Sequence, residues 1–225
     1  MNNIDQDIRR TLERCEIGPL SDIRNAIRSD ARIDLDLIAR CFREELARSS
    51  VSLSILRGMA RAVASLLPDS WSLMRELLFT TKPKAVYEVH FSLFGSLDPD
   101  NFNQLERDGI ELLLVEYLFQ VRSTAEFAAW KAGLVLGEEW RSERSEMELR
   151  WLMTSARFPA GRMGGINGYR FIVQRRETFV EDELRPLRSL VRTDKSQTVR
   201  EGAKFHLDRL IKLRNAASSI KGEVE

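Results

Sequence analysis

Apolar residues recur along most of the chain at the three- and four-residue spacing of amphipathic α-helices. Near the start, Ile4, Ile8, Leu12 and Cys15 fall on one helical face. Segments that contain proline or glycine interrupt the pattern and mark helix ends. The pattern predicts twelve helices in six pairs. The first helices are expected at 4–15, 34–48, 70–79, 102–121, 146–157 and 183–192, and the second helices around Ile23, Leu56, Val86, Ala128, Gly165 and Val199.

The segment 194–210 carries the most specific pattern. Asp194 stands five positions before the pair Val199-Arg200, and a small residue and two leucines follow at helical spacing. This order resembles the second helix of a HEAT repeat. A similar apolar order returns at 49–67 and 83–97.

The resemblance to the HEAT-repeat-like (armadillo-type) α-solenoid family implies an all-α fold, a right-handed α-α superhelix of about six HEAT-like helix pairs. It also implies that the acid and arginine at the positions of Asp194 and Arg200 pair between successive repeats. We expect one solenoid domain over 1–214 and a polar, flexible C-terminal tail over 215–225. The segment 161–176 is compatible with a helix, or with a short strand after its glycine cluster.

The composition is that of a folded, water-soluble protein. Hydrophobic residues make up 43% of the chain and charged residues 31%, with a formal net charge of +1. The longest apolar run, 110–121, is too short and too charged to span a bilayer, and the N-terminus lacks the apolar core of a signal peptide. Cys15 and Cys41 lie on helical patterns without motif spacing. We therefore expect a cytoplasmic protein that does not bind membranes.

The sequence offers little catalytic chemistry. Its two histidines, His90 and His206, fall on inward helical faces, and neither has a second ligand at metal-binding spacing. No nucleophile motif or phosphate-binding loop motif is present. We expect no catalytic residue, no metal and no cofactor.

Four glycines lie between residues 161 and 168. A loop there would present free backbone N–H groups, and an anion would bind through Arg162, Gly164, Gly165 and Arg170. The alternative is that these glycines let the chain turn or let helices pack closely.

The outward side chains of the second helices are the candidate binding residues. Second helices line the concave surface in solenoids of the HEAT type. Trp130 and Leu134 form the binding hot spot there, unless their helix is buried all round. The concave-face candidates are Arg61, Glu88, Trp130, Leu134, Glu201, Lys204 and Asp208.

These features favour a non-enzymatic adaptor that holds a protein or peptide on its concave face. The alternative is a nucleic-acid-binding protein that resembles the DNA alkylation-repair glycosylases, which are also HEAT-like arrays. Their paired tryptophans followed by aspartate are missing, because Trp71, Trp130, Trp140 and Trp151 precede Ser, Lys, Arg and Leu. Nearly balanced charge also disfavours phosphate binding. A third possibility, a lyase or chaperone acting on a bound cofactor or client, has the glycine cluster as its only support.

Overall fold

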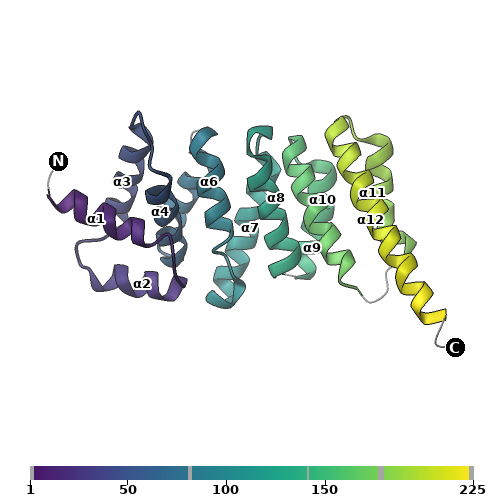
Figure 1. Cartoon of the computed structure of the whole chain (residues 1–225), viewed down its shortest axis with the longest axis horizontal. Helices are drawn as coiled ribbons and strands as arrows, with labels where there is room; N and C mark the ends of the chain where they lie inside the picture. Colours follow the sequence, from purple (N-terminus) through teal and green to yellow (C-terminus); the bar gives the residue numbers. More distant parts are fainter. Residues whose placement is uncertain (1–2, 81–82, 141, 177–179, 223–225) are drawn as a thin grey trace. The chain divides into compact units, whose positions relative to one another are not determined.

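The computed structural model describes the backbone of residues 3–80, 83–140, 142–176 and 180–222, and the side chains of 8–79, 89–122, 124–140, 142–176 and 180–216. The described backbone is helical and contains no strand, which confirms the all-α prediction (Figure 1). The helices are α1 (Asn3–Arg14), α2 (Leu20–Ser29), α3 (Leu35–Ala47), α4 (Leu53–Ser65), α5 (Trp71–Thr80), α6 (Pro83–Phe94), α7 (Gln104–Gln120), α8 (Glu126–Leu134), α9 (Glu143–Ser155), α10 (Pro159–Gln174), α11 (Glu181–Thr193) and α12 (Gln197–Gly222).

Each predicted helical stretch corresponds to one of these helices, and three short helical turns join them. The segment 161–176, for which the sequence was compatible with a helix or a short strand, lies almost entirely in α10. Pro159 begins this helix, a position where its missing N–H costs nothing. Tyr169 and Val173, whose residue types suggested a strand, are both fully buried at the four-residue spacing of one helical face. The short turns are η1 (Pro99–Asn101), η2 (Ser123–Ala125) and the π-helical η3 (Val135–Trp140).

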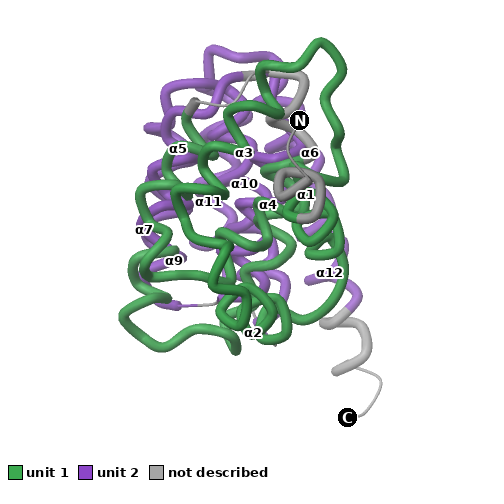
Figure 2. Tube along the Cα trace, turned by 90° about the vertical axis from the view of Figure 1, so that its left-hand side faces the viewer, with its two compact units in different colours: residues 1–110 green, residues 111–225 purple. Residues whose placement is uncertain are grey.

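The chain divides into two compact units, Met1–Ile110 and Glu111–Glu225, whereas the sequence predicted one domain over 1–214 (Figure 2). The division falls inside α7. At the other end, α12 continues to Gly222, so helical backbone extends through most of the segment expected to be a flexible tail. Among the described residues, no helix combines the length and apolar character that a membrane span needs.

Helix α4 is the centre of unit 1. It packs against α1, α2, α3, α5 and α6, and most of its residues between Leu56 and Ser65 are buried. Gly58 lets α1 approach closely, because a Cβ there would lie 2.7 Å from the backbone carbonyl carbon of Leu12. As a result α1 packs mainly on α4, whereas the sequence predicted that α1 would pair with α2.

Helix α10 is the centre of unit 2 and packs against α8, α9 and α12. Its glycines face other helix backbones at very short range. A Cβ on Gly168 would clash with the backbone oxygen of Gly133 in α8, and one on Gly133 would lie 2.7 Å from the carbonyl carbon of Gly164. Such distances are too short for a side chain, so these positions accept only glycine at this helix separation. The glycine cluster thus holds unit 2 together.

Candidate binding surface

Helix α8 presents an exposed aromatic pair, Phe127 and Trp130. Their side chains are 56% and 42% exposed, and their ring centroids lie 6.2 Å apart. On the opposite side of the helix, Ala128, Ala129 and Ala132 are fully buried. The helix is therefore not buried all round, and Trp130 is exposed as the binding hypothesis requires. Leu134 is only half-buried and contributes a smaller apolar area.

The predicted anion-binding loop does not form, because its residues lie within α10. Gly164 and Gly165 are buried in the helix interior, where helical hydrogen bonding and packing leave no free N–H groups for a ligand. Arg162 is also engaged. Its guanidinium makes two bonds to the carboxylate of Asp194, at 2.8 and 3.1 Å, and a third to the carbonyl oxygen of Ala156 at 3.0 Å. Three of the four predicted anion-binding residues are thus structural.

The ion pair between Arg162 and Asp194 connects α10 to the end of α11. The resemblance implied an acid–arginine pair between neighbouring repeats, and Asp194 makes such a pair with Arg162. Arg200 differs from the expectation. It donates to the backbone carbonyl oxygens of Asp194 and Lys195, at 2.7 and 3.2 Å, and so stabilises the turn before α12.

Arg170, the fourth predicted anion-binding residue, is in an unusual environment. Its side chain is 5% exposed, and it donates to two neutral amide oxygens, at 2.7 Å to Gln174 and 3.4 Å to Asn167. Its Nε has no acceptor. The guanidinium carbon also lies 3.5 Å from the centroid of the Phe171 ring. Arg170 is therefore a buried cation whose hydrogen-bond partners are uncharged.

Two residues of α12 complete a basic cluster, which we define as Arg170, His206 and Arg209. Burial, followed by repulsion from Arg209, lowers the pKa of Arg170 to about 10 despite the opposing attraction of Glu138. Burial and both arginines lower the pKa of His206 to about 4, and its Nδ1 has no partner. At neutral pH Arg170 and Arg209 carry the positive charge of the cluster and His206 is neutral, and among the described residues no carboxylate bonds to the Arg170 guanidinium.

The orientation of α12 changes which of its residues extend this surface. Gly202 faces α10, since a Cβ there would lie 2.5 Å from Sδ of Met163. At about 100° per residue, Phe205 and Arg209 lie on the same side as Gly202, while Lys204 and Asp208 lie on the other. Both predicted residues are exposed, but they point away from α10. The prediction placed Lys204 and Asp208 on the concave face, whereas the exposed α12 side chains beside α10 are those of Phe205 and Arg209.

The sequence analysis missed Phe205 and Arg209. Phe205 is 63% exposed, and Arg209 is exposed as well. The third α12 candidate, Glu201, is exposed and accepts a hydrogen bond from Gln197 at 2.8 Å. A phenylalanine one helical turn before an arginine was a signal in the sequence, but its significance depended on which side of α12 faces α10.

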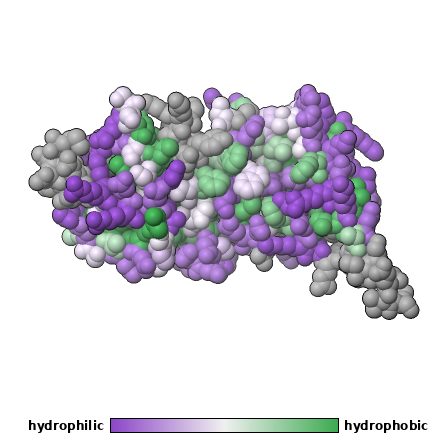
Figure 3. Space-filling view, in the orientation of Figure 1, coloured by the Kyte–Doolittle hydropathy of each residue, from purple (hydrophilic) through white to green (hydrophobic). Residues whose placement is uncertain are grey.

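Asn167 links the aromatic pair to the basic cluster. Its side-chain nitrogen donates to the backbone oxygen of Trp130 at 3.2 Å, and its oxygen accepts the bond from Arg170. We define the binding surface as the aromatic pair, the basic cluster and Phe205. Over α8 and α10, hydrophobic atoms are interspersed with hydrophilic ones (Figure 3).

Of the two predicted site residues of unit 1, Arg61 and Glu88, the structure describes the side chain of Arg61. Arg61 donates to the backbone oxygens of Cys15, at 3.1 Å, and of Gly18, and to Oγ of Ser96 at 3.0 Å. It therefore ties α4 to the turn after α1 and to the end of α6, and is not free to bind a partner. The side chain of Glu88 lies outside the described residues.

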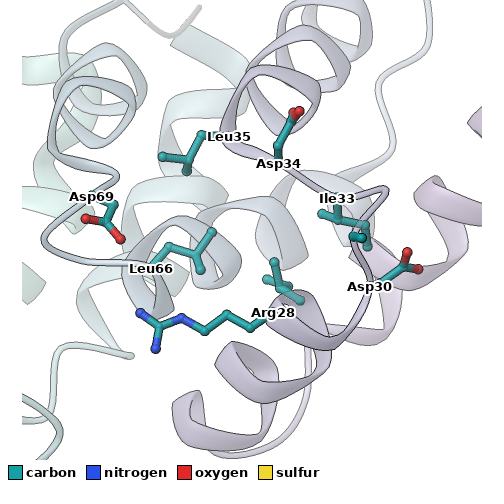
Figure 4. A pocket seen from close by; sticks show the side chains of 9 residues that line it. Arg28, Asp30, Ile33, Asp34, Leu35, Leu66 and Asp69 are labelled. Carbon is teal, nitrogen blue, oxygen red and sulfur yellow. The ribbon is translucent and has the colours of Figure 1, made fainter.

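A cavity of about 210 Å³ lies in unit 1, and Figure 4 shows the side chains that line it. Its carboxylates, Asp30, Asp34 and Asp69, point in different directions. Hydrogen bonds from Arg32 lower the pKa of Asp30 to about 2, and Asp34 caps α3 by accepting from the Leu37 N–H at 2.7 Å. Two of the three acids thus have structural roles, and the cavity has no convergent polar groups.

A second exposed aromatic contact lies on the first helices of unit 2. Phe119 of α7 and Trp151 of α9 stack with ring centroids 5.2 Å apart and planes inclined by 10°, and are 37% and 45% exposed. These rings cover one another. They provide a matched comparison for the exposed aromatic pair on α8.

Among the described residues, no group of three or more histidine, cysteine, aspartate or glutamate side chains could hold a metal ion. The fold and the surface define an all-helical protein with an exposed aromatic and basic surface in unit 2. Comparisons with protein-family models, with curated proteins and with solved structures found no match. The functional argument therefore rests on the contacts within the chain.

Proposed function

We propose that this chain is a non-enzymatic adaptor, a HEAT-like α-solenoid of about six helix pairs that holds a protein partner on the face formed by its second helices. The observation that carries the proposal is the exposure of Trp130 beside Phe127 on a helix whose other side is fully buried. A tryptophan of this kind has no role in the core of unit 2. Its exposure in the free chain is explained if a partner covers it.

The packing of the helices supports the solenoid part of the proposal. In unit 2, α8, α10 and α12 pack in succession, and in unit 1 α4 packs between α2 and α6. Stacking of every second helix is what a repeat of helix pairs requires, because one pair cannot bury its apolar face alone. The ion pair between Arg162 and Asp194 adds a contact between neighbouring pairs in unit 2.

The chemistry of the binding surface favours a protein over a nucleic acid. Tryptophan, tyrosine and arginine dominate binding energy at protein interfaces, and Trp130, Arg170 and Arg209 lie on or next to this surface. Carboxylates are interspersed with them: Glu126 is exposed on α8, and Glu138 is half-buried on η3. A phosphate backbone would meet these negative charges, whereas a folded or extended polypeptide brings charges of both signs.

A pull-down with tagged full-length chain, carried out with and without nuclease, tests this function. Trp130→Ala is expected to reduce the amount of the captured partner at least tenfold, since truncation of a hot-spot residue costs about 2 kcal/mol or more. Trp151→Ala is the matched control, because it removes a similarly exposed tryptophan from α9. Equal capture by both variants would show that the binding surface lies elsewhere. Loss of all captured material on nuclease treatment would support the nucleic-acid alternative.

A further inference from the structure

We propose that the basic cluster of Arg170, His206 and Arg209 is a built site for a single carboxylate, supplied by an aspartate or glutamate in an acidic segment of the protein partner. This inference rests on the proposed function and adds the chemistry by which the partner is recognised. The site lies entirely within unit 2, between α10 and α12.

Arg170 is a buried arginine that bonds to no carboxylate. Two arginines are buried among the described side chains, Arg9 and Arg170. Arg9 bonds to the buried carboxylate of Glu45 at 2.7 Å. Arg170 bonds to no carboxylate, and two of its five N–H groups have acceptors. Burial of a guanidinium without an anion is unfavourable, and an anion that enters the site removes this penalty.

Arg209 of α12 lies close enough to Arg170 of α10 to repel its charge. Met163 and Gly202 face one another where α10 packs against α12. Arg170 and Arg209 each follow these residues by seven positions, which is about two turns along both helices. The two guanidinium groups are therefore at the same level, and they repel one another. Arg209 makes no hydrogen bond or ion pair with the described residues, so it is available to bind a ligand.

Two buried nitrogen atoms of the basic cluster have no hydrogen-bond partner. Nε of Arg170 and Nδ1 of His206 are both buried without a hydrogen-bond partner, and the two side chains are 5% and 9% exposed. Unpaired polar atoms are rare in protein interiors. Four such atoms occur among the described side chains, and the two of the basic cluster are those that lie on neighbouring helices beside a third basic group.

The surroundings favour a carboxylate from a polypeptide. Phe171 lies directly against Arg170, and Phe205 is 63% exposed one residue before His206. Glu138 is near enough to influence Arg170 electrostatically. A single carboxylate flanked by apolar side chains fits Phe171 and Phe205 and brings one negative charge near Glu138. A nucleic-acid strand carries a charge at every residue and would place further phosphates against Glu138.

The experiment is selection of random peptides displayed on phage against the immobilised full-length chain. The wild-type chain is expected to enrich peptides with aspartate or glutamate at one fixed position next to an apolar residue. Arg209→Glu should abolish this preference, because the new carboxylate would itself bind Arg170. Lys204→Glu is the matched control, since it makes the same charge reversal on the side of α12 that faces away from α10, and it should leave the preference unchanged.

An enriched peptide then permits a quantitative test by fluorescence anisotropy. Changing its acidic residue to the amide should weaken binding to the wild-type chain about tenfold or more, the range for a charged hydrogen-bonded pair. The same change should have little effect on binding to Arg209→Glu. The variant Arg170→Met should also bind the peptide more weakly, while the melting temperature of this variant stays equal to or above that of the wild-type chain. A purely structural arginine would lower the melting temperature when replaced.

Enriched peptides without a fixed acidic residue, or an acidic preference that survives in Arg209→Glu, would overturn the proposal. If those peptides still depend on Trp130, the adaptor function stands and only the carboxylate site is refuted. If no peptide is enriched and Trp130→Ala captures as much partner as Trp151→Ala, both proposals are refuted. Binding of a short fluorescein-labelled DNA duplex that is lost in Arg209→Glu would instead assign the basic cluster to phosphates.

Discussion

Replacement of Gly133 by alanine should strongly destabilise unit 2. The new Cβ would lie 2.7 Å from the carbonyl carbon of Gly164, where ordinary contact begins at 3.4 Å, and closer still to the carbonyl oxygen. The obstacle is helix backbone on both sides, so α8 and α10 must separate by more than half an ångström. Their interface also contains Gly137 and Gly168, whose close contact would be lost.

The magnitude follows from two opposing effects. Overpacking of a rigid interface costs about 3 kcal/mol, and the higher helix propensity of alanine returns about 1 kcal/mol. The net loss is about 2 kcal/mol, which for a chain of this size lowers the melting temperature by roughly 4–8 °C.

Gly202→Ala is the matched control for this measurement. Its Cβ would meet the flexible end of the Met163 side chain, which can rotate away, so the propensity gain should leave the melting temperature within about 3 °C of the wild type. Thermal unfolding followed by circular dichroism at the helical signal compares the variants. Equal melting temperatures for Gly133→Ala and Gly202→Ala would refute the close packing of α8 on α10.

Two further predictions concern charged and titrating groups. Asp194→Asn should lower the free energy of unfolding in urea by about 3 kcal/mol, because it leaves the mostly buried guanidinium of Arg162 without its anion. Asp182→Asn, which breaks an exposed ion pair, should change the free energy of unfolding by less than about 1 kcal/mol. Similar losses in both variants would contradict a stabilising role of the pair between Arg162 and Asp194. Burial lowers the pKa of His90 to about 4, so below about pH 6.5 the unfolded chain binds a proton that the folded chain excludes. Stability should therefore fall between pH 7 and pH 5, by about 2 kcal/mol for this group, and an unchanged urea midpoint at pH 5 would show that His90 is not buried in its neutral form.

The helices were predictable because each amphipathic stretch repeats its apolar residues at the helical period and ends at a breaker. The role of the glycine cluster was only partly predictable. Its four glycines are close in sequence, but the backbones they contact belong to α7, α8 and α9. A Cβ on Gly164 would lie 2.5 Å from the Leu118 side chain and 2.7 Å from the backbone oxygen of Ala129, and these contacts depend on how α10 aligns with α7 and α8.

The candidate site was predictable to a similar extent. A helical wheel identifies outward positions, and it selected Trp130 correctly as exposed. It cannot say which outward side faces a neighbouring helix, so it chose Lys204 and Asp208 where the structure has Phe205 and Arg209 beside α10. It also cannot foresee that a long side chain folds back, as Arg61 does onto backbone oxygens of Cys15 and Gly18.

Hydrogen exchange of the full-length chain most directly tests whether unit 2 binds a protein partner through α8, α10 and α12. The exchange is measured by mass spectrometry with and without the protein partner from the pull-down. Slower exchange on binding is expected in α8, α10 and α12, with the largest change around Trp130 and Arg209. Exchange that slows only in α7 and α9, around the stacked Phe119 and Trp151, would contradict it.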